Sequence, residues 1–250
     1  MKTSLLFSSY PFISGEKVTL TRVTDMDAEA LWLLLSDEDT HRFTPEGAVH
    51  SSRECAARLR QFDTLFQERR GVVLGIYSTL NQLVGLLEIS HLDRQVESVT
   101  LSFMLLPEYT GQGYASAAVR AACDYLLRTV GVHRIQCFVL PINYRAVLVL
   151  ERCGFVKEGT IREGFLWPDK GIVDLTLYSL LPTDRKPKPD SPAQYFYKRY
   201  KAPPPGQGGG VFYWSKAARM KSSSFFSRRL TCTWVIPSRA AVWVWVLPWK

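Results

Sequence analysis

The chain has 250 residues, of which 46% are hydrophobic and 22% charged, so it can bury at least one sizeable core and is not disordered as a whole. It has no run of about 18 apolar residues, no secretory signal, no CxxC pair and no zinc-ligand spacing, so we expect a cytoplasmic protein without a membrane partner, disulfide framework or metal. The net charge of +8 arises from residues 184–250, which carry 13 Lys or Arg against two Asp or Glu. The other 183 residues have a net charge of −3, so their charge gives no indication that this part of the chain binds nucleic acid.

Residues 16–106 predict a strand, two helices and then three neighbouring strands. The alternation of side chains over 18–23 predicts the first strand, and capping boxes at 24–27 and 51–54 predict the starts of the helices. Short β-prone segments with few residues between them then predict antiparallel strands at 72–77, 83–91 and 98–106.

A second series of elements follows Pro107. Gly111 and Gly113 precede a helix with aligned apolar residues, and a further helix ends at Gly154. The strands of this half are predicted at 135–140, 155–161 and 172–180. Together the two halves predict an α/β (α+β) fold whose sheet is mixed rather than purely parallel.

The composition changes after Leu181, where Pro, Gly and Trp become frequent and no acidic residue follows Asp190. We therefore predict an N-terminal extension over 1–15, a folded domain over 16–183 and a basic, disordered tail over 184–250. Two interpretations of the tail stay open. Its Lys and Arg among aromatic residues over 195–229 could contact RNA, or the tail was never selected to fold.

The segment 105–115, Leu-Leu-Pro-Glu-Tyr-Thr-Gly-Gln-Gly-Tyr-Ala, carries the strongest functional signal. Two glycines separated by one residue let main-chain N–H groups turn toward an anion, and the start of the next helix adds about half a positive charge. A pyrophosphate would fit there, although a plain tight turn has the same pattern. No Gly-Lys-Ser/Thr follows and the segment comes too late for a first βα turn, so nucleotide hydrolysis and dinucleotide redox chemistry are not indicated.

This segment resembles the acyl-CoA loop of the GNAT superfamily of N-acetyltransferases. The stretch from about Val18 to Leu181, about two thirds of the chain, resembles the RimJ/RimL subgroup, the ribosomal-protein-alanine N-acetyltransferases. Besides the glycine loop, the resemblance is carried by Thr24 to Leu31, Val132 to Ile135, Pro141 to Asn143, Val149 to Phe155, Glu158 to Glu163 and Asp174 to Leu181.

The resemblance implies the GNAT fold, a mixed, mostly antiparallel sheet flanked by helices and splayed between its fourth strand (98–106) and fifth strand (135–140). Acetyl-CoA would lie between these strands as co-substrate. By position, main-chain groups of Met104, Leu105 and Leu106 would bind its pantetheine arm. Its pyrophosphate would lie on the amides of Gly111, Gln112, Gly113, Tyr114, Ala115 and Ser116. Asn143 would contact it near the reacting end, or would only cap the helix that follows.

Acetyl transfer from a thioester to an amine needs an uncharged amine, a polarised carbonyl and a proton for the departing thiolate. Ala146 stands where RimJ/RimL relatives commonly have Ser, Leu150 where other branches have Tyr, and Thr100 where a Glu is common. A direct acid is therefore missing. Because the thiol of CoA, like that of cysteine, has a pKa of about 8.5, an acid assists the reaction without being indispensable.

Three side chains remain as candidates for proton transfer. Glu88 and Glu163 could each act as a base through water, with a preference for Glu163, and Tyr144 could substitute for the acid. Each glutamate could instead be a solvated residue at a strand edge or a partner of Arg134 or Arg162.

The sequence thus predicts an enzyme, a monomer or homodimer, that transfers acetyl from acetyl-CoA directly to a primary amine. The acceptor would be a protein N-terminal α-amine, as on a ribosomal protein, or a small molecule. The alternative is a CoA-binding or structural module that has lost its catalytic groups, an interpretation motivated by Ala146, Leu150 and Thr100.

Overall fold

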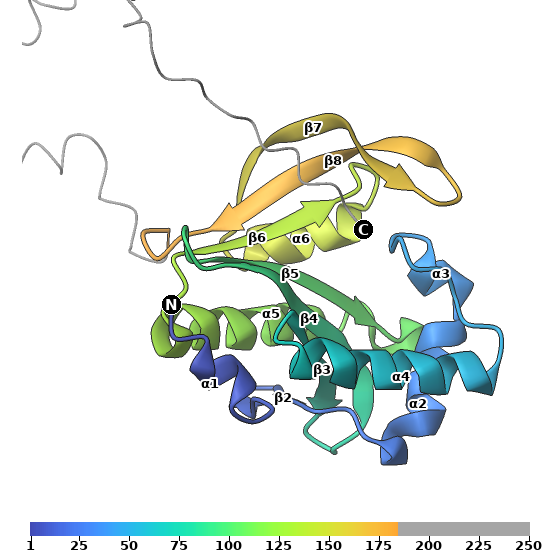
Figure 1. Ribbon diagram of the computed structural model, residues 1–250. Helices are drawn as coiled ribbons and strands as arrows, with labels where there is room; N and C mark the ends of the chain where they lie inside the picture. The colour runs from blue at the N-terminus through green and yellow to red at the C-terminus, as the bar shows by residue number, and fades with distance from the viewer. Residues whose placement is uncertain (185–250) are drawn as a thin grey trace, which may run out of the picture. The chain divides into compact units, whose positions relative to one another are not determined.

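One mixed sheet of eight strands organises residues 1–184, the part of the chain that the computed structural model describes (Figure 1). The strands are β1 (Ile13–Ser14), β2 (Val18–Thr21), β3 (Gly71–Ser78), β4 (Leu83–Asp93), β5 (Ser98–Leu105), β6 (Arg134–Val139), β7 (Val156–Trp167) and β8 (Gly171–Leu180). Their order is β1-β2-β3-β4-β5-β6-β8-β7, and every pair is antiparallel except β5 with β6. The mixed, mostly antiparallel sheet is confirmed. The basic tail beyond Asp184 lies outside the described residues.

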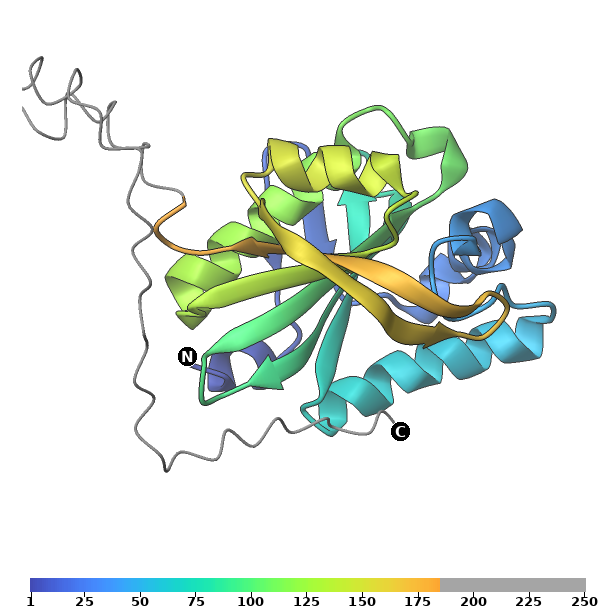
Figure 2. The ribbon, with the colours of Figure 1, turned by 90° about the horizontal axis from the view of Figure 1, so that it is seen from above.

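Helices cover both faces of this sheet. They are α1 (Ser4–Phe7), α2 (Ala28–Ser36), α3 (Glu38–His41), α4 (Ser52–Gln67), α5 (Tyr114–Asp124), which continues as the π-helix η3 (Tyr125–Val130), and α6 (Tyr144–Arg152). Figure 2 shows α5 and α6 on one side of the strands and α4 on the other. In the described part of the chain, none of the helices combines the length and the apolar character that a bilayer span needs.

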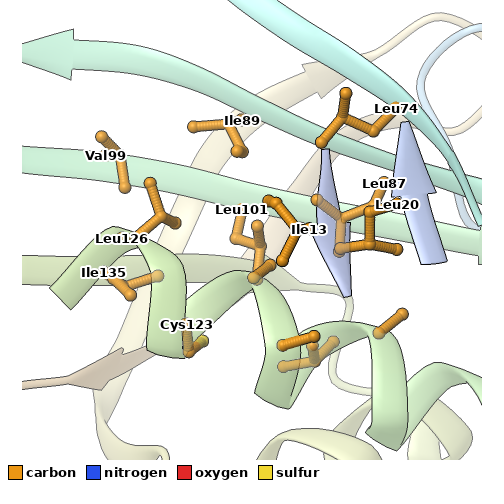
Figure 3. Packing of buried hydrophobic residues seen from close by; sticks show 14 of the residues in the cluster. Ile13, Leu20, Leu74, Leu87, Ile89, Val99, Leu101, Cys123, Leu126 and Ile135 are labelled. Atoms are coloured by element: carbon orange, nitrogen blue, oxygen red, sulfur yellow. The ribbon is translucent and has the colours of Figure 1, made fainter. Parts of the chain in front are cut away.

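The period-two alternation of β4 divides the buried side chains into two clusters. Leu87 and Ile89 belong to the cluster that packs against α5 and η3, together with Leu126 (Figure 3). Leu86 belongs to the other cluster, with Leu31 of α2. Glu88 follows the same alternation, so its carboxylate is on the face of the sheet that carries α2 and α4.

The ladder between β5 and β6 is short, and this creates the predicted splay. Only three residue pairs connect the two strands, Ser98 with Arg134, Val99 with Ile135 and Thr100 with Gln136. Beyond the third pair, β5 continues to Leu105 and β6 to Val139 without pairing to each other. We call the unpaired segments 101–105 and 137–139 the β5–β6 opening. A side-chain bond from Gln136 Nε2 to Thr100 Oγ1, at 3.3 Å, marks its closed end.

Residues 1–15, which the sequence suggested as an extension, contribute to this core. Leu6, Phe7 and Ile13 are buried in the α5 cluster, and β1 pairs with β2. These elements are only four and two residues long, so no periodic pattern could reveal them.

Strands β7 and β8 form a hairpin that is longer than the sequence predicted. The pairing of β7 is irregular between Lys157 and Gly159 and again between Ile161 and Phe165, which interrupts the alternation that marks a strand. At its base, a three-strand contact ties the hairpin to β6. Arg134 Nη1 and Nη2 donate to the carboxylate of Glu158 at 2.7 and 2.5 Å, and Ser179 Oγ donates to it at 2.6 Å. Arg134 is therefore a partner of Glu158.

We predict that Glu158→Gln destabilises the protein in a pH-dependent way. The Arg134 guanidinium and then the Ser179 hydroxyl lower the pKa of Glu158 to about 2. A carboxyl whose pKa is depressed by folding contributes stability above its unfolded pKa of about 4.3 and loses that contribution as pH falls toward the folded value. The melting temperature of the variant should therefore be below that of wild type at pH 7, and the two should converge between pH 4 and pH 2.

Glu68→Gln is the matched control, because Glu68 pairs with its near neighbour Arg70 on the surface. Its effect on melting should be small at every pH. A Glu158→Gln deficit that stays constant down to pH 2 would contradict the assigned role of the ion pair.

Candidate active site

The glycine loop joins the end of β5 to the start of α5. A single 3-10 turn, η2 (Pro107–Tyr109), follows the strand, and Gly111 and Gly113 then adopt left-handed backbone angles with φ of +74° and +86°. A Cβ at either glycine would meet nothing within 4 Å. The backbone conformation, and not a lack of space, therefore requires glycine at both positions.

The first amides of α5 have no hydrogen-bond partner within the helix. The first helical bond of this segment runs from Ala117 N–H to Gly113 O at 3.0 Å. The amides of Tyr114, Ala115 and Ser116 precede it and have no carbonyl one turn back within the helix. These donors and the helix dipole suit a phosphate group, which fits the role expected of residues 111–116.

Side chains of the loop hold its shape. Gln112 Nε2 donates to Glu108 O at 2.6 Å, and Thr110 Oγ1 donates to Pro107 O at 2.8 Å. The side chain of Gln112 thus closes the loop on itself. A further bond comes from a distant part of the chain, because Lys17 Nζ donates to Gln112 O at 2.7 Å. No local sequence motif predicts this contact, because the two residues are 95 positions apart in the chain.

The register of β4 and β5 determines which main-chain groups face the β5–β6 opening. In an antiparallel pair, successive residues alternate between bonding the partner strand and pointing away from it. Leu106 N–H donates to Val84 O at 2.9 Å, and Met104 lies opposite Leu86, two residues along each strand. A Cβ at Gly85 would lie 2.2 Å from Met104 O, in keeping with a carbonyl that points to β4.

This register limits which of the residues expected to bind the pantetheine arm have main-chain groups directed toward the opening. The main-chain groups of Met104 and Leu106 point to β4, and Leu106 O also accepts from Tyr109 N–H at 3.0 Å. By the same alternation, the groups of Phe103 and Leu105 point into the β5–β6 opening. The residues of this segment whose main-chain groups face the opening are therefore Leu105, which the sequence analysis named, and Phe103, which it did not. Only the strand register could have revealed this.

Glu88 lies on β4 beside the closed end of the opening. Glu88 pairs with Ser102 of β5. The last β5 residue that pairs with β6 is Thr100, two residues before Ser102. Burial, followed by the nearby charge of Glu46, raises the pKa of the Glu88 carboxyl, and hydrogen bonds from Ser90 and Ser102 and the charge of Arg58 partly offset this rise. A carboxylate with a raised pKa is suited to accept a proton near neutral pH.

Glu163 is in a different environment. It lies in the irregular part of β7, with φ of +50°, and its side chain is exposed. Its main-chain N–H donates to Asp174 Oδ1 at 2.7 Å. Strand β7 is at the far edge of the sheet, separated from β5 by β8 and β6. The strand order thus places Glu88, and not Glu163, next to β5.

Asn143 and Tyr144 both lie at the start of α6. Asn143 Oδ1 accepts from Ala146 N–H at 3.2 Å, which confirms the cap interpretation of this residue. Tyr144 is the first residue of the helix and is 71% exposed. Leu150, at the position of a tyrosine acid in other branches, is fully buried.

A cavity of about 330 Å³ lies beside the first part of the glycine loop, between η2, the start of α2 and the β3–β4 turn. Its lining includes Asp27, Glu29, Glu108 and Tyr109, and it includes neither Glu88 nor Asn143. Among residues 1–184, no group of three or more His, Cys, Asp or Glu side chains is placed to hold a metal ion.

Comparison with known proteins agrees with this geometry. Residues 17–156 match the model of the acetyltransferase (GNAT) domain family. The [ribosomal protein uS5]-alanine N-acetyltransferase of Escherichia coli is 25% identical over an alignment of 177 residues that covers 66% of this chain and 90% of that protein. The spermidine N(1)-acetyltransferase of Vibrio cholerae is 37% identical over 98 residues, 39% of this chain and 55% of that protein.

A solved structure shares the fold. Mycobacterium smegmatis RimJ, in complex with CoA-disulfide, superimposes with a TM-score of 0.64 at 20% sequence identity. The superposition covers 76% of this chain and 95% of RimJ.

We predict that Gly113→Ala weakens acetyl-CoA binding and lowers the free energy of unfolding by about 1–2 kcal/mol, because alanine is strained at positive φ. Calorimetric titration and thermal unfolding measure the two effects. Gly159→Ala is the control, since Gly159 has no positive φ and an added Cβ would meet nothing within 4 Å. Unchanged affinity in Gly113→Ala would argue against the loop as the phosphate site.

We predict that Glu88→Gln raises the melting temperature at pH 8. Because folding raises the pKa of this carboxyl, its ionised form opposes folding, and the penalty disappears below the unfolded pKa. The variant should therefore exceed wild type at pH 8 and match it near pH 4. Equal melting temperatures at both pH values would show that the carboxylate is not desolvated.

Proposed function

The chain belongs to the GNAT acetyltransferase family and is an N-acetyltransferase with acetyl-CoA as co-substrate, and on this premise we propose that it acetylates the α-amine of a protein N-terminus with Glu88 as the base. We further propose that it is a cytoplasmic enzyme of the RimJ/RimL type. The similarity to the uS5-alanine enzyme supports this acceptor, because it extends over 90% of that protein.

The co-substrate fits the residues that are present. Its diphosphate suits the free amides at the start of α5, and its amide-containing arm suits the main-chain groups of Phe103 and Leu105 in the β5–β6 opening. These two sets of groups are joined by the glycine loop, so one extended ligand can use both. When bound, acetyl-CoA supplies an activated acetyl group to the closed end of the opening.

The position of Glu88 is the observation that carries the proposal. The side chain of Glu88 is half-buried, the pKa of its carboxyl is raised, and the residue lies one strand away from the point where β5 and β6 separate. An α-amine with a pKa of about 8 is roughly one tenth neutral at pH 7, so only a modest base is required. Glu88 can take the proton of the amine directly or through a water molecule.

The remaining proton is needed by the thiolate that leaves. Tyr144 stays the proposed donor, because it is exposed at the start of α6, next to Asn143. Since the thiol of CoA has a pKa of about 8.5, solvent can also supply this proton. We propose Glu88 and not Glu163 as the base, because Glu163 lies on β7, which is three strands away from β5 in the sheet order.

A small polyamine is the second candidate acceptor. The 37% identity to a spermidine N(1)-acetyltransferase favours it, although that match covers only 55% of the relative. Both acceptors present a primary amine to the same base. They differ in that a peptide also presents the main-chain groups of the residues that follow its N-terminus, which the enzyme would have to bind.

We predict that Glu88→Gln lowers kcat/KM for the best acceptor about 100-fold at pH 7, the usual effect of losing a general base. Glu163→Gln serves as the comparison that decides between the two glutamates, and we expect its kcat/KM to fall less than threefold, as for a surface residue without contact to substrate. CoA release should be measured with peptides of different N-terminal residues and with spermidine. A larger loss in Glu163→Gln than in Glu88→Gln would overturn the assignment. Binding of acetyl-CoA without turnover across the panel would favour a non-catalytic module.

A further inference from the structure

The turn between β1 and β2 packs directly on α5. Gly15 N–H donates to Val18 O at 2.8 Å, which closes the turn. A Cβ added to Gly15 would lie 3.1 Å from Ala121 Cβ, so glycine permits this close approach of turn and helix. The turn is thereby fixed relative to the helix whose first residues form the proposed phosphate site.

Lys17 extends from this turn to the glycine loop. Its Nζ donates to Gln112 O at 2.7 Å and lies 4.5 Å from the centroid of the Tyr114 ring. Gln112 separates the two left-handed glycines, and Tyr114 is the first residue of α5. The ammonium group is therefore held on both sides of Gly113. Lys17 is exposed, and an ammonium has three donors, so donors remain for a ligand.

The net charge of the loop explains why a cation at the position of Lys17 would favour an anionic ligand. Residues 105–116 contain Glu108 and no Lys or Arg, so the loop itself carries a net negative charge. The diphosphate that it is expected to bind is also anionic, and the helix start offers only about half a positive charge. A full positive charge from outside the loop is needed to offset Glu108. Lys17 brings one within hydrogen-bond distance of the loop.

We propose that Lys17 binds the diphosphate of acetyl-CoA. It keeps its bond to Gln112 O and donates a second hydrogen bond to a phosphate oxygen, while Tyr114 limits the positions of its ammonium group. A residue 95 positions upstream of the loop thus supplies the cation that many phosphate loops carry in their own sequence. The assignment depends on the use of acetyl-CoA and not on the acceptor or on Glu88.

The test uses the full chain with Lys17→Met, which keeps the aliphatic stem and removes the charge. Its KM for acetyl-CoA should rise about tenfold, the effect of losing one charge-assisted hydrogen bond. Its KM for S-acetyl-pantetheine, which lacks both the diphosphate and the nucleoside, should not change. Lys17→Arg should retain most of the acetyl-CoA affinity. Lys157→Met, an exposed lysine on β7, controls for the change in net charge.

Acetyl-dephospho-CoA distinguishes the two phosphate sources within the same ligand, because it keeps the diphosphate and lacks the 3′-phosphate. The tenfold rise in KM caused by Lys17→Met should persist when acetyl-dephospho-CoA is the acetyl donor. If the rise disappears, the assignment to the diphosphate is overturned. An equal effect on acetyl-CoA and S-acetyl-pantetheine would reveal a purely structural role. If Lys17→Met does not fold, Lys17→Gln is measured instead, with the same three acetyl donors and the same criteria.

Discussion

The short β5–β6 ladder is the constraint on which the rest of the site depends. Main-chain N–H and C=O groups inside a protein need partners, and a strand that leaves its neighbour after three pairs exposes a row of them. Strand β4 satisfies one half of that row through Met104 and Leu106. The other half, on Phe103 and Leu105, is available to an extended ligand that carries amides of its own.

The sequence predicted the elements of this site better than their orientation. The glycine loop was recognisable because the left-handed backbone angles at positions 111 and 113 favour glycine, which is visible in the sequence. Which residues of β5 face the opening depends on its register with β4, and the residue types of Phe103 and Met104 do not encode that register. The contact of Lys17 with the loop was equally beyond sequence analysis, because only the tertiary packing of the β1–β2 turn on α5 brings this residue to the loop.

The candidate bases illustrate how the topology decides between similar residues. Glu88 was predicted on a strand and Glu163 just beyond one, and their local sequence gave only a preference between them. The order β4-β5-β6-β8-β7 places one next to β5 and the other at the far edge. Burial of the ionised Glu88 carboxylate opposes folding, a cost in stability that its proposed role as the base would account for. The Arg134, Glu158 and Ser179 contact acts in the opposite direction and ties together the strands on the other side of the opening.

Residue-resolved amide hydrogen exchange, with and without acetyl-CoA, tests the central claim most directly. If the ligand completes the open edge of β5, exchange at Phe103 and Leu105 should slow when acetyl-CoA binds. The amide of Leu106, already bonded to Val84 O, should change far less. Binding that leaves Phe103 and Leu105 unprotected would contradict the account, because acetyl-CoA would then lie somewhere other than the β5–β6 opening.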